Sequence, residues 1–582
     1  MKVKDKQKQN LRSAGAKAST PKHVKEGKGK TEQAKGGKKK SLLNHLPILP
    51  IPIIAFLLIW WWTASWQGDV FRMMRENSFF VPDSLMMRFE TCLPYGMLWC
   101  AGRALLMLFR YPWLGGAVLS FILTLSCWLL GYAMRLKAGW RWIQWLPLAA
   151  YTGIFTYQGI NNYFESETGQ AMGIPLAILA ILIVWGVMIR SFSRKPSPAF
   201  LRIPKDESPR ANYLQLLVII AVGLLPAILY GNMARAYVRP IARMQVGVME
   251  QDWDDVIKTA EANAEQSYRP LAANFAIALV QTGQVGERFF NIRLDYDSLY
   301  IVGMNGDRQN ALGLYQMECD LHAGLVQTAY HHAMENMAML GPTLRNLKTL
   351  CKASLLRNEW EVAEKYLTIL DRVPLEGDFV EKYRPMLRNS EAVNSDPEFA
   401  VIRSTEPIHD NFENHLVQPV FLGYTASLAE GRSTNALYNS LMVNIYTKTM
   451  PDFLMRSQGI TGQTPPLSIA QALNLMSSKY PEIMQSFNGL NLYSNDLQNF
   501  LNETAPYVQS RPGITEEEKA QLRALGHTPS GTDTLTSSEN RALHARELFP
   551  RYKGYYPYYY FFGNLKATKK RDNKGSSNAG VN

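Results

Sequence analysis

The sequence has 582 residues and a formal net charge of +13, which is enough chain for several domains. The charge is concentrated at the two ends: residues 1–40 and 566–582 carry +11 and +4, which leaves −2 for residues 41–565. Because the body of the chain is not basic, its composition argues against a nucleic-acid groove, and no nucleic-acid partner is expected. A basic tail that precedes a membrane span marks the cytoplasmic side and attracts anionic lipid.

The two ends of the chain have the composition of disordered tails. Residues 1–44 consist mainly of Lys, Gly, Gln, Ala and Ser, with almost no large apolar side chains. Such a segment cannot bury enough surface to offset the conformational entropy of the chain. We therefore expect disordered basic tails over 1–44 and 566–582.

Residues 45–234 are predicted to form a membrane domain with about five spans. Runs of about 20 apolar residues cross a hydrocarbon core of about 30 Å as helices. One further apolar stretch, 94–109, carries Arg103 near its middle, where an arginine costs roughly 2.5–3.5 kcal/mol on insertion scales. We expect a helix at the membrane surface there, with a sixth span as the alternative. The five predicted spans are 46–66, 113–134, 142–160, 171–189 and 213–234.

The charges of the loops predict an orientation for this domain. With the N-terminal tail in the cytoplasm and five spans, the basic loops 135–141 and 190–210 are both cytoplasmic. The loop 161–170, which has acidic but no basic residues, is then outside, as the positive-inside rule requires. Six spans would place both basic loops outside, and Arg235, Arg239 and Arg243 oppose the five-span orientation mildly. We expect a multi-pass protein of the cytoplasmic membrane with a periplasmic C-terminal half.

Residues 235–390 show the helical spacing of apolar residues, separated by Gly, Pro and Asp turn signals. Short helices of this kind bury their apolar faces by stacking side by side. The predicted fold class is therefore all-α, a multi-span membrane domain followed by a helical solenoid. The predicted helices are 241–250, 253–264, 270–282, 309–320, 321–337, 343–357 and 360–371.

One pair of these helices, Thr343–Pro374, resembles a tetratricopeptide repeat unit. Leu347, Leu350 and the small Cys351 stand where the first helix of such a unit packs. The resemblance implies a helical solenoid and leaves its ligand open. The residues that match the second helix of the family are Trp360, Ala363, Leu367 and Pro374.

Residues 391–565 are predicted to be an irregular helical extension. Helical pieces at 433–449, 467–478 and 537–548 lie between loops that are rich in Gly, Pro, Asn and Ser. The tyrosine-rich run 552–562 fits two interpretations. It is either a packed cap on the solenoid or an exposed aromatic strip for glycan, lipid headgroup or a partner.

No metalloprotease, P-loop, serine-hydrolase or zinc motif is present, so neither a cofactor nor a metal is expected. The five cysteines contain no C-x-x-C spacing, which favours free, buried thiols over a disulfide framework. His331 and His332 are adjacent, so on a helix they point in different directions. We interpret His322 and His331 as structural residues on helix surfaces.

Asp69 directly follows the first predicted span and begins the segment GDVFRMMRENSFFVP. This arrangement resembles the first outer loop of lipid-linked (GT-C type) glycosyltransferases. That resemblance implies a carboxylate that acts as a base or holds a divalent cation at the membrane face. Glu165 and Glu167 lie on the same predicted side and complete the candidate catalytic set. Asp69 lacks the adjacent second acid of those enzymes, and the simpler interpretation, which we favour, is that all three are solvated loop residues.

The order of basic tail, short-looped spans, helical repeats and tyrosine-rich end resembles an uncharacterised family of multi-span proteins from Bacteroides-type bacteria. That resemblance implies no activity. The first functional hypothesis is a membrane-anchored scaffold that recruits a protein partner at the envelope, with membrane lipid as its other partner. The alternative is an envelope glycosyltransferase with Asp69 as catalytic carboxylate.

Overall fold

The computed structural model describes residues 50–163, 168–192, 209–266, 268–294, 300–302, 308–406, 434–529 and 533–563. These residues all belong to one compact unit, Pro47–Asn582. The predicted tails, together with Glu165 and Glu167, lie outside the described residues.

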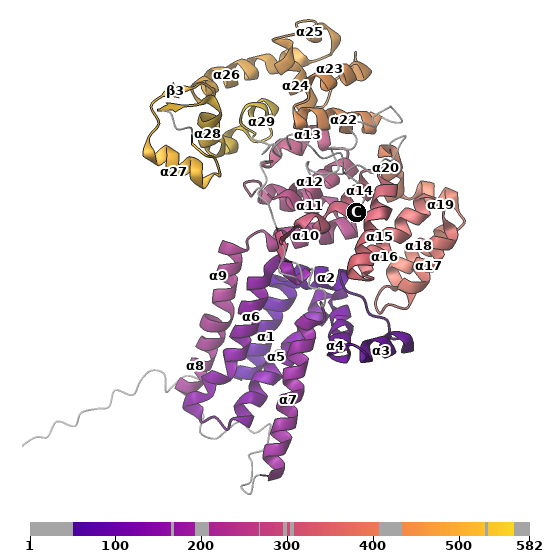
Figure 1. The fold of residues 1–582 in the computed structure, drawn as a ribbon, viewed down its shortest axis with the longest axis vertical. Helices are drawn as coiled ribbons and strands as arrows, with labels where there is room; N and C mark the ends of the chain where they lie inside the picture. The colour runs from indigo at the N-terminus through magenta and orange to yellow at the C-terminus, as the bar shows by residue number, and fades with distance from the viewer. Residues whose placement is uncertain are drawn as a thin grey trace, which may run out of the picture. The chain divides into compact units, whose positions relative to one another are not determined.

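The N-terminal part is a bundle of apolar helices that run side by side (Figure 1). Among the residues that the structure describes, three helices are long and apolar enough to cross a membrane, namely Pro112–Ala133, Gln170–Ile189 and Pro209–Ala234. They correspond to three of the five predicted spans. The other two predicted spans form shorter helical segments. The elements of the bundle are α1 (Ile51–Trp61), η2 (Trp62–Trp66), α5 (Pro112–Ala133), η4 (Ala138–Trp145), α6 (Leu146–Gln158), η5 (Gly159–Tyr163), α7 (Gln170–Phe192), α8 (Pro209–Val218), η6 (Ile219–Leu224) and α9 (Leu225–Ala234).

Successive helices of the bundle run in opposite directions. At one end, the Trp60 indole donates to the Trp113 carbonyl at 2.8 Å, which joins the end of α1 to the start of α5. Tyr157 and Tyr230, which end α6 and α9, stack at the same end of their helices. At the opposite end, Gln144 donates to Gln215, which joins the starts of α6 and α8. The chain therefore leaves α1, α6 and α9 at one end of the bundle and leaves α5 and α7 at the other.

Four short helical segments connect α1 to α5: α2 (Gly68–Glu76), α3 (Ser84–Thr91), α4 (Gly96–Leu106) and η3 (Met107–Arg110). With 11 residues, α4 is about 16 Å long, roughly half the thickness of a hydrocarbon core. Arg103 of α4 forms an ion pair with Glu90 of α3. Segment 94–109 thus forms a short helix whose arginine has a carboxylate partner, and it packs against α7.

The C-terminal half begins with a series of short helices in which chain neighbours pack against each other, as α15, α16 and α17 do. Several are capped by polar side chains; Thr343, for example, accepts from the Asn346 amide at the start of α16, as an N-cap should. The elements are α10 (Val238–Glu250), α11 (Trp253–Ala262), α12 (Arg269–Gln281), α13 (Val285–Arg288), η7 (Phe289–Asn291), β1 (Tyr300–Val302), β2 (Arg308–Asn310), η8 (Ala311–Leu314), α14 (Gln316–His322), α15 (Val326–Leu340), α16 (Leu344–Leu356), α17 (Trp360–Asp371), α18 (Gly377–Tyr383), η9 (Arg384–Met386), α19 (Ser390–Ser395) and α20 (Pro397–Thr405).

The predicted helices 309–320 and 321–337 have the wrong boundaries. Residues 308–310 pair in antiparallel fashion with 300–302, and the helix α14 begins only at Gln316. The next break lies at Gly324, which has a φ of +86° and packs against the backbone at Glu406. The apolar spacing continues through this break, so periodicity alone did not reveal it.

The last part of the chain packs a tyrosine-rich helix into the core. Tyr556 is fully buried, and its hydroxyl donates to the Ile445 carbonyl at 3.2 Å. Tyr559 donates to the Tyr446 carbonyl at 2.7 Å. This segment is therefore a packed cap rather than an exposed strip. The elements are α22 (Thr434–Thr447), α23 (Met450–Ser457), η10 (Gln458–Ile460), α24 (Leu467–Ser477), α25 (Ile483–Ser486), η11 (Leu490–Tyr493), α26 (Ser494–Val508), β3 (Arg511–Pro512), α27 (Glu516–Ala524), β4 (Thr534–Leu535), α28 (Ser537–Tyr552) and α29 (Tyr556–Phe562), with β3 and β4 antiparallel.

Candidate functional site

Helix α2, which directly follows α1 and η2, joins the apolar bundle to the C-terminal helices. Its Phe71 ring stacks on Phe109 and Phe155 of the bundle, with ring centroids 4.6 and 4.5 Å away. Other residues of α2 contact α10 and α16. Met73 and Met74 are also buried. A helix of nine residues is thus enclosed on several sides, and both parts of the protein contribute to its surroundings.

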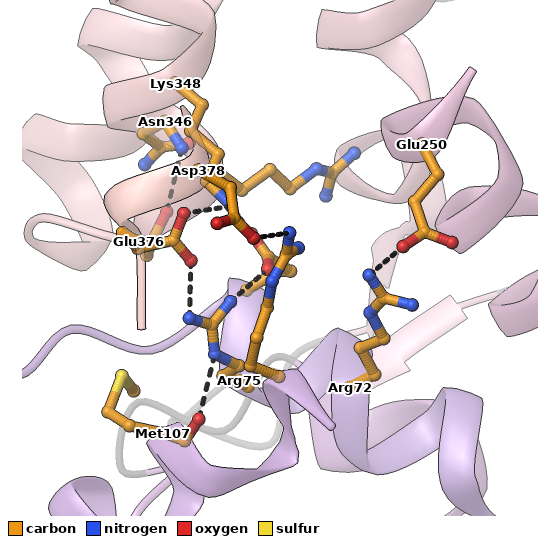
Figure 2. A network of polar contacts seen from close by, with 12 residues as sticks. Arg72, Arg75, Met107, Glu250, Asn346, Lys348, Glu376 and Asp378 are labelled. Carbon is orange, nitrogen blue, oxygen red and sulfur yellow. Dashed lines mark hydrogen bonds and ion pairs between the residues drawn. The ribbon is translucent and has the colours of Figure 1, made fainter. Parts of the chain in front are cut away.

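Arg75 of α2 carries its charge into this interior, where its side chain is fully buried. The guanidinium contacts Glu76 at 2.6 Å and Glu376 at 2.5 Å. Its Nε donates to the Met107 carbonyl at 3.2 Å. Figure 2 shows Arg75 between Glu376, which precedes α18, and Met107, which begins η3. One buried cation therefore connects three segments that are far apart in sequence.

Lys348 of α16 completes the network. Its ammonium lies 2.8 Å from Glu76 and 3.0 Å from Glu376. Burial alone would raise the pKa of Glu76, but Lys348 and Arg75 outweigh burial and lower it to about 2. Glu76 is therefore ionised in the folded protein. Two carboxylates and two cations form one buried, hydrogen-bonded cluster, which we call the Arg75 network.

The Arg75 network forms part of the wall of a cleft with a volume of about 350 Å³. Residues of α2, α10, α14, α16 and α18 line this cleft. From α16 it receives Arg345, Lys348 and Lys352, which share one face of the helix because of their spacing. The cleft also contains acidic partners for its cations. Glu318 pairs with Arg345 of α16, and Glu250 pairs with Arg72 of α2. The cleft thus has a charged lining of both signs, and its size is at the lower end of small-molecule sites.

A further buried carboxylate, Glu398, lies behind this wall. It accepts from Lys352 and from the Tyr383 hydroxyl, each at 2.7 Å, and from Gln251 at 2.5 Å. Burial opposes its ionisation, but Lys352 and His322 lower the pKa of Glu398 to about 2. Burial also lowers the pKa of His322 to about 4, although Glu398 attracts its proton. The histidine is therefore neutral at pH 7 while the carboxylate is charged.

Comparison with known proteins gives a family but no activity. A family model described as a family of unknown function, DUF6057, matches residues 160–563, which is more than half of the chain. The chain belongs to the DUF6057 family. No curated protein and no solved structure matches it. The prediction of an uncharacterised family is confirmed to this extent.

Only part of the cleft lining lies within the residues that the DUF6057 model matches. The walls formed by α10, α14, α16 and α18 lie inside the matched residues, whereas α2 and η3 precede them. Glu376 and Lys348 therefore lie within the family match, and their partner Arg75 does not. The Arg75 network joins the matched region to the segment that precedes it.

Asp69 lies apart from the cleft in this DUF6057 protein. It is half-buried in the first turn of α2. Burial raises the pKa of its carboxyl, although Arg243 and Arg72 lower it. The other two candidates, Glu165 and Glu167, lie outside the described residues, so the predicted catalytic set is not tested as a whole. Among the residues that the structure describes, no group of three or more His, Cys, Asp and Glu side chains could hold a metal ion.

The residues predicted to pack the repeat unit lie on two contacting helices, α16 and α17. Leu347, Leu350, Ala363 and Leu367 are buried. Trp360 and Pro374, at the start of α17 and beyond its end, are half-buried. The observed pair has the helix boundaries that the apolar spacing predicts, within one or two residues.

Two predictions for individual residues were wrong. His322 is buried, with its ring edge against Trp253 at 5.2 Å, and not on a helix surface. Cys92 is exposed, whereas the other four cysteines are buried as predicted. Both errors arise because α14 and α3 end close to these residues, where spacing along a helix no longer tells which side faces the core.

Sequence reasoning missed the Arg75 network altogether. Its residues come from segments around 75, 348 and 376, and no local pattern links them. One signal was available: α2 places Arg75 and Glu76 among Phe71, Met73 and Met74. Two charges in so apolar a helix require partners if the helix is buried.

Proposed function

We propose that this protein is a membrane-anchored scaffold that holds a helical-repeat domain outside the cytoplasm in a fixed orientation and presents the cleft to a protein partner. The observation that carries the proposal is the Arg75 network. A helix that directly follows an apolar bundle is fastened to the C-terminal helices by buried charges. Separating the two parts would expose or unpair these charges, which costs several kcal/mol. The network therefore supports a rigid presentation rather than a flexible tether.

The alternating directions of the bundle helices support this orientation. The basic loop 135–141 and the flanks of segment 190–210 lie at the end of the bundle opposite to α2 and the C-terminal half. With the basic loops in the cytoplasm, the cleft is outside. The three arginines that oppose this orientation have partners: Arg243 pairs with Asp255 at 2.5 Å, Arg239 lies 3.7 Å above the Trp66 ring, and Arg235 donates to the Tyr157 carbonyl. Because these arginines are held by contacts within the protein, their positive charges are weaker indicators of the cytoplasmic side.

Reporter fusions test the orientation. We expect fusions after residues 138 and 200 to report from the cytoplasm, and fusions after residues 165 and 300 to report from outside. A cytoplasmic signal at 300 would contradict the proposal, because the cleft would then face the cytoplasm.

Site-specific photo-crosslinking in the intact, full-length protein tests the recruiting role. A photoreactive amino acid replaces Lys382, which lines the cleft and is 40% exposed. The matched control replaces Lys365, an exposed lysine of α17 that does not line the cleft. We expect one defined protein adduct from position 382 and none from 365. Equal labelling at both positions, or none at 382, would count against a partner in the cleft.

The glycosyltransferase alternative stays a prediction. One observation favours it: burial raises the pKa of Asp69 at the bundle-facing end of α2. The scaffold accounts for more of the structure, because the buried charges of the cleft are paired with one another and not aimed at a reacting group.

A further inference from the structure

A strip of apolar side chains is exposed on and after α3. We call it the α3 strip; it comprises Leu85, Phe89, Leu93, Tyr95 and Met97. Leu85, Phe89 and Tyr95 are 71%, 64% and 75% exposed. Leu85 and Phe89 are one helical turn apart and therefore lie on the same face. Adjacent large apolar groups with this exposure indicate a contact surface.

The opposite face of α3 is fixed to the protein. Met86 and Met87 pack against the core that contains the α16–α17 pair. The Glu90 carboxylate is buried and pairs with Arg103 of α4. The one acidic side chain of α3, Glu90, thus points away from the strip. Arg88, which precedes Phe89 of the strip, is exposed. The strip is an outward face of an anchored helix, and it carries no carboxylate.

The α3 strip continues onto the apolar bundle through α4. Where α4 meets the start of α7, a Cβ on Gly102 would lie 2.0 Å from the Gly169 carbonyl oxygen, so the two backbones touch. From there α7 exposes a stripe of isoleucines at 174, 178 and 181. Helix α7 is one of the helices that are long and apolar enough to cross a membrane. Helix α4 therefore joins the α3 strip to the start of α7, whose exposed face is apolar.

Aromatic side chains mark this level of the bundle. Tyr95 contacts Trp99, with ring centroids 6.2 Å apart. Trp113, at the start of α5, is 59% exposed. Trp and Tyr concentrate at the boundary between hydrocarbon and headgroups. Tyr95 of the α3 strip and Trp113 are exposed aromatic residues of this kind.

We propose that the α3 strip is seated in the interfacial region of the lipid leaflet on the side of the C-terminal half. Leu85 and Phe89 would enter the acyl-chain boundary, Tyr95 would lie among the headgroups, and Arg88 would reach lipid phosphate. The proposal rests on the membrane anchor of the proposed function and adds a second attachment. Since α3 is joined to α2 and packs on the core of the C-terminal helices, lipid contact here would hold the cleft at a set distance from the bilayer.

The protein contains its own probe for this proposal. Cys92 is exposed at the end of α3, and the other cysteines are buried, so a thiol-reactive nitroxide would label this position of the native chain. The full-length protein is placed in nanodiscs of phosphatidylethanolamine and phosphatidylglycerol. Collision of the nitroxide with oxygen, which partitions into lipid, is compared with collision with a water-soluble nickel chelate. We expect the Cys92 label to favour oxygen.

Two reference positions, both built on Cys92→Ser, separate the possible outcomes. Ile181→Cys on the exposed face of α7 reports the membrane anchor, and Lys365→Cys on α17 reports bulk water. If Ile181→Cys favours oxygen while the Cys92 label behaves like Lys365→Cys, the lipid proposal is overturned and the anchor stands. If Ile181→Cys favours nickel, the anchor fails as well. A Cys92 label shielded from both reagents means that a protein or a second copy covers the strip, which also overturns the proposal.

Discussion

At the scale of single residues, the decisive feature is a cation without access to water. Arg75 is fully buried; its guanidinium donates to Glu76 and to the Met107 carbonyl and forms an ion pair with Glu376. Such a group is stable only when its hydrogen bonds are satisfied. Removing one member of the network leaves its partners charged, buried and incompletely paired. In an exposed ion pair of the same protein, by contrast, the remaining partner is solvated by water when the other is removed, so little stability is lost.

We expect Arg75→Met to destabilise the folded protein by roughly 3–5 kcal/mol, because it leaves Glu76 and Glu376 with Lys348 alone. The measurement is the unfolding free energy of the detergent-solubilised protein. Arg384→Met is the matched control, since its pair with Asp371 is half-exposed on both sides, and we expect at most about 1 kcal/mol. Adding Glu376→Gln to Arg75→Met should recover part of the loss. Similar losses for Arg75→Met and the control would show that the network does not hold the two parts together.

His322 makes stability depend on pH in a defined window. Burial lowers its pKa from 6.5 to about 4 in the folded state, so between these values the unfolded chain binds a proton that the folded chain does not. Stability therefore falls as pH falls through this window, by about 2 kcal/mol between pH 7.5 and pH 5. Glu398 adds its own loss only below about pH 4.5, since its pKa is lowered from 4.5 to about 2.

The variant His322→Gln tests this pH dependence, because glutamine cannot take up the proton. We expect the difference in unfolding free energy between pH 7.5 and pH 5 to shrink by about 2 kcal/mol relative to the wild type. The control is His331→Gln, which changes an exposed histidine of α15. An unchanged slope in His322→Gln would mean that folding does not lower the pKa of this histidine.

At the scale of elements, α2 and the α16–α17 pair show two different routes to a buried helix. The pair is amphipathic in the ordinary way, with Leu350 and Ala363 fully buried between the two helices. The shorter α2 is enclosed on several sides and carries charges into its interior contacts. An amphipathic helix such as α16 can be predicted from its apolar spacing. Helix α2 cannot be recognised as buried in this way, because its charged residues have the sequence pattern of a solvent-exposed face.

The core of the α16–α17 pair can be tested by removing volume. We expect Leu350→Ala to cost about 2–5 kcal/mol of unfolding free energy, because it leaves a cavity that rigid neighbours cannot fill. Leu492→Ala removes the same atoms from a side chain that is 78% exposed and should change the unfolding free energy by at most about 0.5 kcal/mol. Equal effects of the two variants would contradict the packing of this pair.

At the scale of the whole molecule, the two parts share a continuous interior. One core cluster includes residues of α1 and α5 together with residues of α10, α12 and α24. A second includes Phe80, Val81 and Met107 together with the buried residues of α16 and α17. The segment between α1 and α5 contributes to both. The helices of the apolar bundle and the C-terminal helices are therefore expected to unfold together rather than as independent domains.

The sequence by itself determined the features that depend on neighbouring residues. Apolar length predicted the three helices of the described residues that are long and apolar enough to cross a membrane. Apolar spacing predicted α10, α11, α12, α16 and α17 to within a few residues, but it missed α13 and misplaced the boundaries of α14 and α15. The tertiary structure alone decided which charges meet. Arg75, Lys348 and Glu376 come together only after three distant segments pack, and a Coulombic contact leaves no periodic trace in the chain. The cleft exists for the same reason, because its walls belong to helices that only the folded chain brings together.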